Sequence, residues 1–231
     1  MLLQDAKIMK STSTHGNGGA LAVVASKIAL ENVQIEDSVT NIGSGGAMFL
    51  DGQAEAHLLR SDLINNRAAA AGGHIKLAAS TFIVHDEESQ LTWPASEPIF
   101  PDSMVLGYEN KSSSSSSSFT KGISAASGGA ISCASSSSSK EKPIQIFDTE
   151  PASGNCYPYR KDVHLNTLQH ACFSKGVHIG HGTSVSDSIA TGNGGVIDAV
   201  SCSISLEQVT LKNENMNKKG LLLMAFEAVK N

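Results

Sequence analysis

The chain has 231 residues and a formal net charge of −5, with 40% hydrophobic and only 17% charged residues, so it can bury a core as one domain or two small ones. The absence of a Lys/Arg cluster argues against a nucleic-acid partner, and no apolar run is long enough for a membrane-spanning helix. Its 21 glycines outnumber seven Phe, three Tyr and one Trp, which favours thin, repetitive β layers.

Glycine pairs followed by a small or apolar residue recur along the chain. The first three pairs are separated by equal intervals of about 27 residues, a period typical of stacked repeat architectures, and two later pairs follow at longer intervals. The ten glycines are Gly18, Gly19, Gly45, Gly46, Gly72, Gly73, Gly128, Gly129, Gly194 and Gly195. So short a unit cannot close a core alone, and each unit must therefore lie on its neighbours.

Short bursts of Val, Ile, Ser, Thr and Asn fill residues 1–92, which indicates strands and tight turns rather than helices. At ~3.3 Å per residue, one unit makes about three short strands, and stacked units make a parallel β-helix. The glycine pairs then mark corners that need positive φ or close backbone approach. We expect the small residue after each of four of the pairs (Ala20, Ala47, Ala130 and Val196) to point into a narrow interior, with the next residue, such as Met48, nearby.

A second element follows the pairs at a nearly constant delay, where an apolar residue such as Leu63 or Leu211 ends an alternating segment. Asn65, Asn66 and Asn213 come directly after it. Asparagine tolerates left-handed backbone and bonds to nearby backbone, so these residues are expected at corners.

From residue 93 the composition changes. Residues 93–125 contain three prolines and the serine run Ser112–Ser118, which indicates a flexible Pro/Ser-rich insertion. The coils are expected to resume over 126–231, with a second insertion near 135–165 and one more strand in the segment KGLLLMAFEAVKN. Because uncapped end coils would be sticky, we expect the chain to be part of a longer polypeptide.

The histidine cluster His164, His170, His178 and His181 could suggest a metal site. It lacks an orienting acid and a helical frame, so we favour surface histidines at coil corners, with no metal and no cofactor. Cys133, Cys156, Cys172 and Cys202 lie far apart, and the sequence leaves open two disulfides or four buried thiols.

Carboxylates are the residues that catalysis on polysaccharides would need, as pairs about 5–9 Å apart. Asp51, Asp86, Asp148 and Asp198 share no common place in the repeat, although Asp51 and Asp198 lie at similar offsets from their glycine pairs. Arg60 and Arg67 have no acidic stack opposite them. We therefore expect no catalytic centre, with a polysaccharide lyase or glycoside hydrolase on the same fold as the alternative.

The segments GGAL, GGAM, GGAI and GGVI resemble the GGA[ILV] repeat of the polymorphic outer-membrane protein family. The family's trailing FxxN motif is only loosely retained, because no Phe precedes Asn65 or Asn213. The resemblance implies an all-β, single-stranded right-handed parallel β-helix of the pectin-lyase-like kind, with Ser/Pro-rich loop excursions.

The resemblance further implies a non-catalytic adhesive or structural module of a cell-surface or secreted protein. Its partner would be a surface protein or glycan of a host or neighbouring cell. The sequence shows neither a signal peptide nor the membrane-anchoring barrel of that family, so the extracellular location depends on the resemblance.

Overall fold

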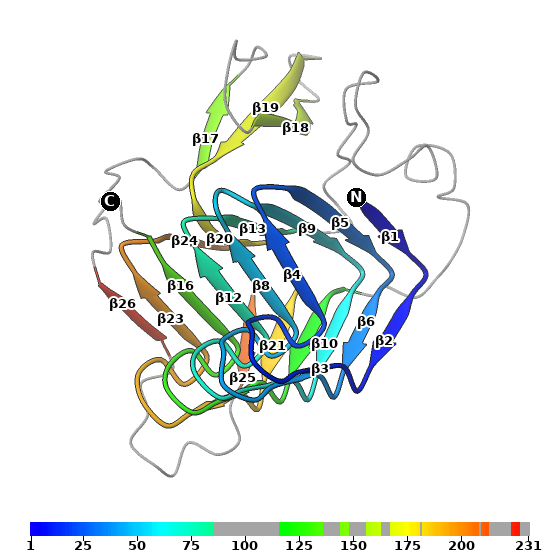
Figure 1. Cartoon of the computed structure of the whole chain (residues 1–231). Helices are drawn as coiled ribbons and strands as arrows, with labels where there is room; N and C mark the ends of the chain where they lie inside the picture. The colour runs from blue at the N-terminus through cyan, green and yellow to red at the C-terminus, as the bar shows by residue number, and fades with distance from the viewer. Residues whose placement is uncertain are drawn as a thin grey trace.

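The computed structural model describes residues 1–85, 116–135, 144–147, 156–162, 167–180, 182–207, 209–212 and 223–226. Within these ranges the chain is all-β and contains no helix. Four sheets of parallel strands run along a stack of coils, and a small antiparallel sheet lies apart from them (Figure 1). This arrangement is consistent with the parallel β-helix that the glycine spacing predicts. Accordingly, the described ranges contain no helix that could span a membrane.

Sheets A and B each contain six strands, one from each successive coil. Sheet A is β1 (Leu2–Gln4), β5 (Lys27–Glu31), β9 (Glu55–Leu59), β13 (Thr81–Val84), β20 (Gly176–Ile179) and β24 (Ser203–Leu206). Sheet B is β2 (Lys7–Met9), β6 (Gln34–Glu36), β10 (Asp62–Ile64), β14 (Ser118–Thr120), β21 (Ser184–Ser186) and β25 (Thr210–Lys212). In the first three coils a short corner joins the strand of sheet A to the strand of sheet B.

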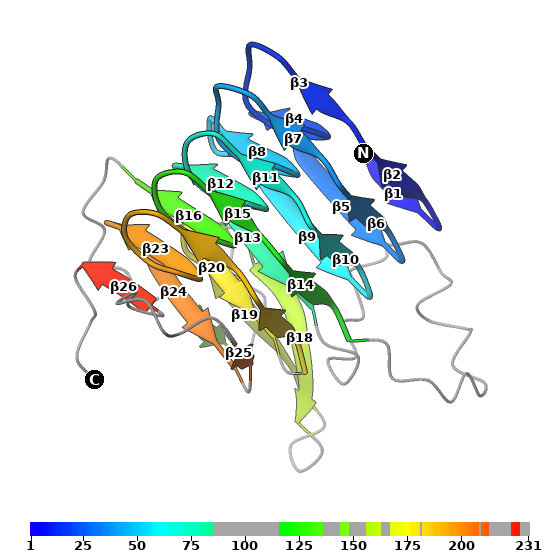
Figure 2. The same ribbon diagram turned by 90° about the horizontal axis from the view of Figure 1, so that it is seen from below.

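Sheets C and D complete each coil. Sheet C is β3 (Thr12–Ser13), β7 (Val39–Thr40), β11 (Arg67–Ala68), β15 (Ile123–Ser124) and β22 (Ile189–Ala190). Sheet D is β4 (Leu21–Val24), β8 (Met48–Asp51), β12 (Ile75–Ala78), β16 (Ile131–Ala134), β23 (Ile197–Val200) and β26 (Leu223–Phe226). Strand β26 lies in the last segment that the sequence predicts to be a strand. Figure 2 shows the equivalent strands of successive coils stacked beside one another.

The antiparallel sheet E is formed by β17 (Ile144–Phe147), β18 (Cys156–Asp162) and β19 (Thr167–Phe173), in the order β17-β19-β18. Strands β17 and β18 lie in the predicted second insertion. In the first predicted insertion, 93–125, residues 93–115 lie outside the described ranges. Its last residues form β14 and β15, which pair within sheets B and C. Strand β20 pairs with β13 after both excursions, so the stack continues in the same order.

The core is the interior of the stack, filled by alternate residues of each strand. In sheet B, Ile35, Leu63 and Phe119 align one above another, and none of them is exposed. Of the small residues expected to point inward, Ala47, Ala130 and Val196 are fully buried, whereas Ala20 in the first coil is only partly buried. Met48, beside Ala47, is also fully buried. After the third pair, the place of Ala47 is taken by a histidine, which is also fully buried.

The corners are made by residues in the left-handed region. Asp5, Asn32 and Arg60 have φ near +50° between sheets A and B, as do Asp37 and Asn65 between sheets B and C. This backbone conformation is uncommon for side chains other than Asn, Asp and Gly. Because the same corner recurs in successive coils, each strand starts in register with the equivalent strand of the preceding coil.

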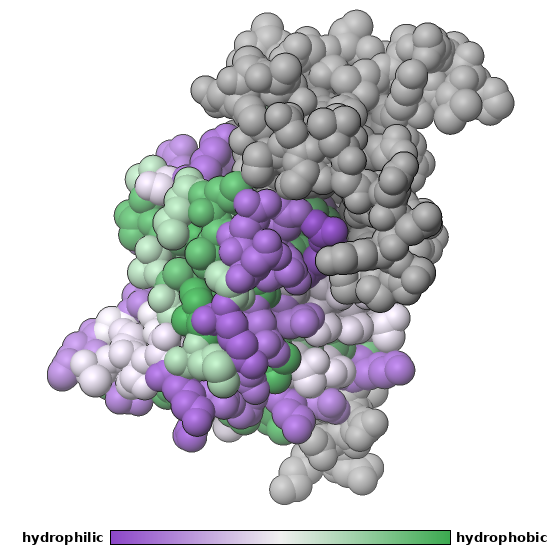
Figure 3. Space-filling model, turned by 90° about the vertical axis from the view of Figure 1, so that its right-hand side faces the viewer, coloured by the Kyte–Doolittle hydropathy of each residue, from purple (hydrophilic) through white to green (hydrophobic). Residues whose placement is uncertain are grey.

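Among the described residues, no further coil stacks on the outer side of the first coil. Leu3, Ile8 and Leu21 pack on the core but remain partly exposed, and Met9 and Val24 are 47% and 57% exposed. Figure 3 views this end, where hydrophobic residues gather between hydrophilic ones. Because β1 to β4 are the edge strands of their sheets, this surface combines apolar side chains with backbone groups that pair with no other described strand.

Candidate functional site

The glycine pairs form a column at the turn between sheets C and D. The first glycine of each pair, from Gly18 to Gly194, has a φ of +57° to +72°. Amide N–H groups of the second glycines donate to the next coil, as from Gly46 to Gly72 O at 3.1 Å. A Cβ on Gly46 would clash with the carbonyl oxygen of Gly73. The turn therefore excludes side chains and has a structural role in stacking.

The asparagines that the sequence assigns to corners have different surroundings. Asn66 is fully buried, accepts a hydrogen bond from Ser38 N at 2.9 Å and donates to Ile35 O at 3.0 Å, so it joins adjacent coils. Asn65 is exposed, has φ +52° and donates to Asp37 Oδ1. Asn213 lies outside the described residues.

Among the described residues, no group of three or more His, Cys, Asp or Glu residues could hold a metal ion. His164 and His181 lie outside these ranges, and His170 is placed only by its backbone in β19. The expectation of surface histidines is wrong for His178, which is 2% exposed in the middle of β20. Its Nε2 contacts Ser174 O at 2.8 Å, and burial lowers its pKa to about 4.

His178 belongs to a larger feature, a buried patch on the outward face of the middle strands β5, β9, β13 and β20 of sheet A. Glu55 Oε1 lies 2.5 Å from His57 Nε2, and His57 Nδ1 lies 2.8 Å from His85 Nε2. Burial alone would raise the pKa of Glu55, but the hydrogen bond and charge of His57, with the charge of Lys27, hold that pKa below its ordinary value. Burial and the charge of His57 hold the pKa of His85 well below its ordinary value. This network can share a proton, but a substrate has no access to residues that are 0–6% exposed.

Of the four candidate acids, Asp86 and Asp148 lie outside the described residues. Asp51 and Asp198 point outward from sheet D but lie three strands apart, on β8 and β23, which is about 14 Å at ~4.8 Å per strand. This spacing is too long for a glycosidase pair. The expectation that Arg60 lacks an acidic partner is wrong, because it forms an ion pair with Glu31. Arg67 is exposed on β11.

The outer face of sheet B carries a continuous row of polar side chains. One outward residue from each strand aligns with the next: Lys7, Gln34, Asp62, Ser118, Ser184 and Thr210. Asp62 Oδ1 accepts hydrogen bonds from Ser118 N at 3.1 Å and Ser118 Oγ at 2.5 Å. We call this set the polar row. It runs along the stack axis and offers both donors and acceptors.

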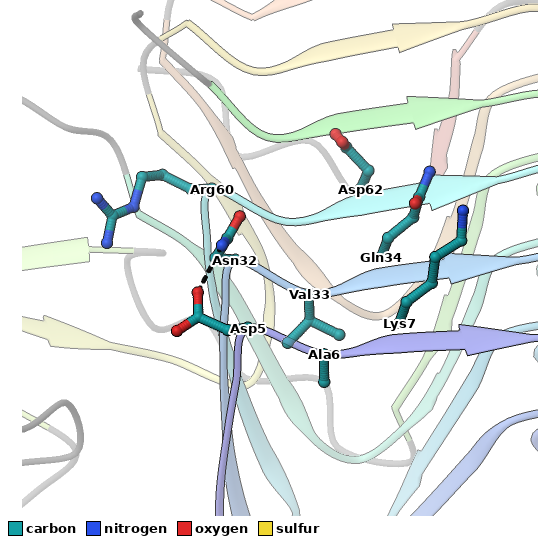
Figure 4. A pocket seen from close by; sticks show the side chains of 8 residues that line it. All are labelled: Asp5, Ala6, Lys7, Asn32, Val33, Gln34, Arg60 and Asp62. Atoms are coloured by element: carbon teal, nitrogen blue, oxygen red, sulfur yellow. Dashed lines mark hydrogen bonds between the residues drawn. The ribbon is translucent and has the colours of Figure 1, made fainter. Parts of the chain in front are cut away.

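A groove of about 310 Å³ lies where the polar row meets the corner from sheet A (Figure 4). It is lined by Asp5, Ala6, Lys7, Asn32, Val33, Gln34, Arg60 and Asp62. Asn32 Nδ2 donates to Asp5 Oδ1 at 2.5 Å, and Lys7 Nζ pairs with Glu36 at 3.1 Å. Figure 4 shows the corner residues on one side and Lys7, Gln34 and Asp62 on the other. The groove carries charges of both signs, which suits a polar ligand.

A second aligned set on the outer face of sheet D was missed by motif reasoning. Lys76, Ser132 and Asp198 occupy the same register position on β12, β16 and β23. Each lies at the same offset from the first glycine of its pair, and this shared offset could have identified the set from the sequence. Lys76 Nζ donates to Ser132 Oγ at 3.1 Å.

The cysteines form two disulfides, Cys133–Cys202 and Cys156–Cys172. The first joins β16 to the residue before β24 over a sequence separation of 69, and the second joins β18 to β19 over a separation of 16. Of the two possibilities that the sequence leaves open, the structure therefore has disulfides.

No family model, curated protein sequence or solved structure matches this chain.

Proposed function

We propose that this chain is a non-catalytic, right-handed parallel β-helical module of a cell-surface or secreted protein, with an adhesive or structural role. Its partner is a surface protein or glycan of a host or neighbouring cell. Right-handedness follows from the general preference of parallel strand connections, which are right-handed in about 98% of cases.

The polar row of sheet B is the observation that carries this proposal. Its outward side chains are Lys, Gln, Asp, Ser, Ser and Thr, aligned on six successive strands. A row of three hydroxyl groups, one amide and two charged groups, beside a groove of about 310 Å³, can make many weak hydrogen bonds to an extended partner. By contrast, Asp51 and Asp198 are too widely separated for glycosidic chemistry.

The disulfides support an extracellular location. Disulfides persist in oxidising compartments and are rare where thiols are kept reduced. Cys133 is fully buried in the core cluster, so its bond to Cys202 joins the last coils of the stack from within. A stack held in this way is suited to a rigid spacer that presents a binding face.

The test is binding of the fluorescently labelled, oxidised chain to intact cells, compared between two double variants. Lys7→Ala/Gln34→Ala alters the polar row, whereas Arg67→Ala/Asn41→Ala removes matched exposed groups elsewhere. We expect the first to weaken binding about fivefold, the effect of losing roughly 1 kcal/mol of contacts, and the second to leave it unchanged.

The same preparations are incubated with a panel of polysaccharides. Release of reducing ends or unsaturated products would overturn the non-catalytic assignment. Absence of cell binding by the unaltered chain, or equal losses in both double variants, would overturn the adhesive role of the polar row.

A further inference from the structure

We propose that Asn17 and Asn193 are sites of spontaneous covalent modification, at which the asparagine side chain loses ammonia and becomes aspartate or isoaspartate. Both residues lie in turns of the glycine column and not in the polar row, so this property goes beyond the proposed function and does not depend on it. Figure 2 shows these turns, between sheets C and D, lying one behind another along one edge of the stack.

The turn requires a glycine directly after each of these asparagines. Gly18 has φ +71°, and a Cβ on it would clash with the carbonyl oxygen of Leu21. Gly194 has φ +57°, and a Cβ on it would clash in the same way with the carbonyl oxygen of Ile197. Asparagine precedes glycine nowhere else in the chain. The other three turns of the column place a residue without a carboxamide at this position: Ser44, Ala71 and Ser127.

An asparagine followed by glycine is chemically reactive, because glycine has no side chain to hinder the approach of its backbone nitrogen. In the first turn, the nitrogen of Gly18 loses its proton to solvent and bonds to Cγ of Asn17. The Cγ–Nδ2 bond breaks, and the departing nitrogen takes up a proton and leaves as ammonia. Water then opens the succinimide ring at one of its two carbonyl carbons, which gives aspartate or isoaspartate. The reaction needs no co-reactant besides water, and the side chains of both asparagines are exposed to it.

The next coil restrains this reaction in the first turn. Gly18 N donates to Ser44 O at 3.0 Å, and Asn17 Oδ1 accepts from Ser44 N at 2.8 Å. While these two bonds persist, the nitrogen keeps its proton and the carboxamide is held toward the next coil. Reaction at Asn17 therefore requires the first turn to separate from the second coil, a local opening that does not need the whole stack to unfold.

The two products have different effects on the stack. Aspartate at position 17 keeps an oxygen that can accept from Ser44 N, so the first turn can remain in place. Isoaspartate adds one methylene group to the backbone directly before Gly18, where even a Cβ would meet the carbonyl oxygen of Leu21. We expect only isoaspartate to displace the first coil.

The experiment compares the oxidised chain with the free peptide HGNGGA, both incubated in mildly alkaline buffer. Peptide mapping by mass spectrometry follows the loss of each asparagine, and enzymatic methylation detects isoaspartate. We expect both Asn17 and Asn193 to convert, and Asn17 to convert about tenfold more slowly than the peptide, because local opening must precede its reaction. Urea below the unfolding transition should reduce this difference.

Two controls separate this chemistry from general damage. Asn17→Ser introduces the residue type that the second coil has at the same place, and it should abolish conversion at position 17 while position 193 still reacts. Asn41 is exposed and followed by Ile42, so it should stay unmodified over the same period. In thermal melts, Asn17→Asp should match the unaltered chain, whereas the fraction that carries isoaspartate should melt at a lower temperature.

The proposal is overturned if Asn17 or Asn193 remains unconverted after about a hundred times the period that converts the peptide, or if Asn41 converts as fast as either of them. Conversion of Asn17 at the rate of the peptide would contradict its protection by Ser44. Equal melting of the aspartate and isoaspartate forms would contradict the predicted effect on the first coil. The mass readout is independent of cell binding, so its failure is distinguishable from failure of the proposed function.

Discussion

His74 is the residue at which one coil departs most from its neighbours. It occupies the place that Ala47 and Ala130 take in adjacent coils, and it is fully buried. Asn66 Nδ2 lies 3.1 Å from its Nδ1, which gives the ring a polar contact inside the core. Burial lowers the pKa of His74 to about 3, although a backbone hydrogen bond at Thr120 opposes the shift. His74 is therefore neutral in the native state.

The buried imidazole predicts a loss of stability in mild acid. The unfolded chain binds a proton at His74 below pH about 6.5, whereas the native chain does not until about pH 3. Stability therefore falls as the pH decreases through this window, by up to about 1.4 kcal/mol per pH unit. Between about pH 6.5 and about pH 5, the free energy of unfolding measured with urea should fall by roughly 1.5 kcal/mol more for the unaltered chain than for His74→Val. Equal losses in both proteins would contradict this assignment.

At the scale of the element, the turn between sheets C and D is the most demanding part of each coil. Gly46 does not need positive φ; it needs space, because Gly73 O and Arg67 N lie where its Cβ would be. Gly52, on the other side of sheet D, has φ +64°, but the nearest atom to the place of its Cβ is 3.5 Å away. Gly46 is therefore required because a side chain would clash, whereas Gly52 is favoured only by its backbone conformation.

Alanine at these two positions should therefore have unequal effects. Gly46→Ala forces adjacent coils apart and should lower the free energy of unfolding by at least about 3 kcal/mol. Gly52→Ala incurs only left-handed strain, about 1 kcal/mol. Chemical denaturation of both variants checks the difference. If Gly46→Ala were as mild as Gly52→Ala, the glycine column would not be the contact that sets coil spacing.

Across the whole molecule, stability is distributed along the stack, because each coil contacts mainly its neighbours. Sheet E stands outside this ladder, as none of its described strands pairs with sheets A to D. The two disulfides therefore act on different units. Cys133–Cys202 closes a long loop through the core, and Cys156–Cys172 lies within sheet E.

Removal of each disulfide should show this division. Cys133→Ala/Cys202→Ala is expected to lower the free energy of unfolding of the coils by roughly 2–4 kcal/mol, because it frees a long loop in the unfolded chain. Cys156→Ala/Cys172→Ala should change it by less than about 0.5 kcal/mol, the range of substitutions remote from the unfolding unit. Thermal melts followed by circular dichroism provide the comparison, and equal destabilisation by both double variants would show that sheet E and the coils unfold together.

The repeating all-β architecture could be predicted from residue order alone, since equal glycine spacing and strand-like alternation are satisfied together by stacked coils. The inward residues at the glycine turns could be predicted as well, because the place after each pair recurs with a small side chain. Ala47, Ala130 and Val196 are buried as this pattern predicts. His74 breaks the pattern, and its burial follows from its place in the coil and not from its residue type.

Which outward-pointing side chains lie next to one another across a sheet could be known only from the folded chain. Lys76, Ser132 and Asp198 lie far apart in the sequence, and they align because the chain leaves the stack and returns to the same register after excursions of unequal length. The pairing of the cysteines and the burial of His178 depend on the same returns. Alternation specifies whether a side chain points in or out, but its neighbours across the sheet depend on register, which long-range backbone pairing sets.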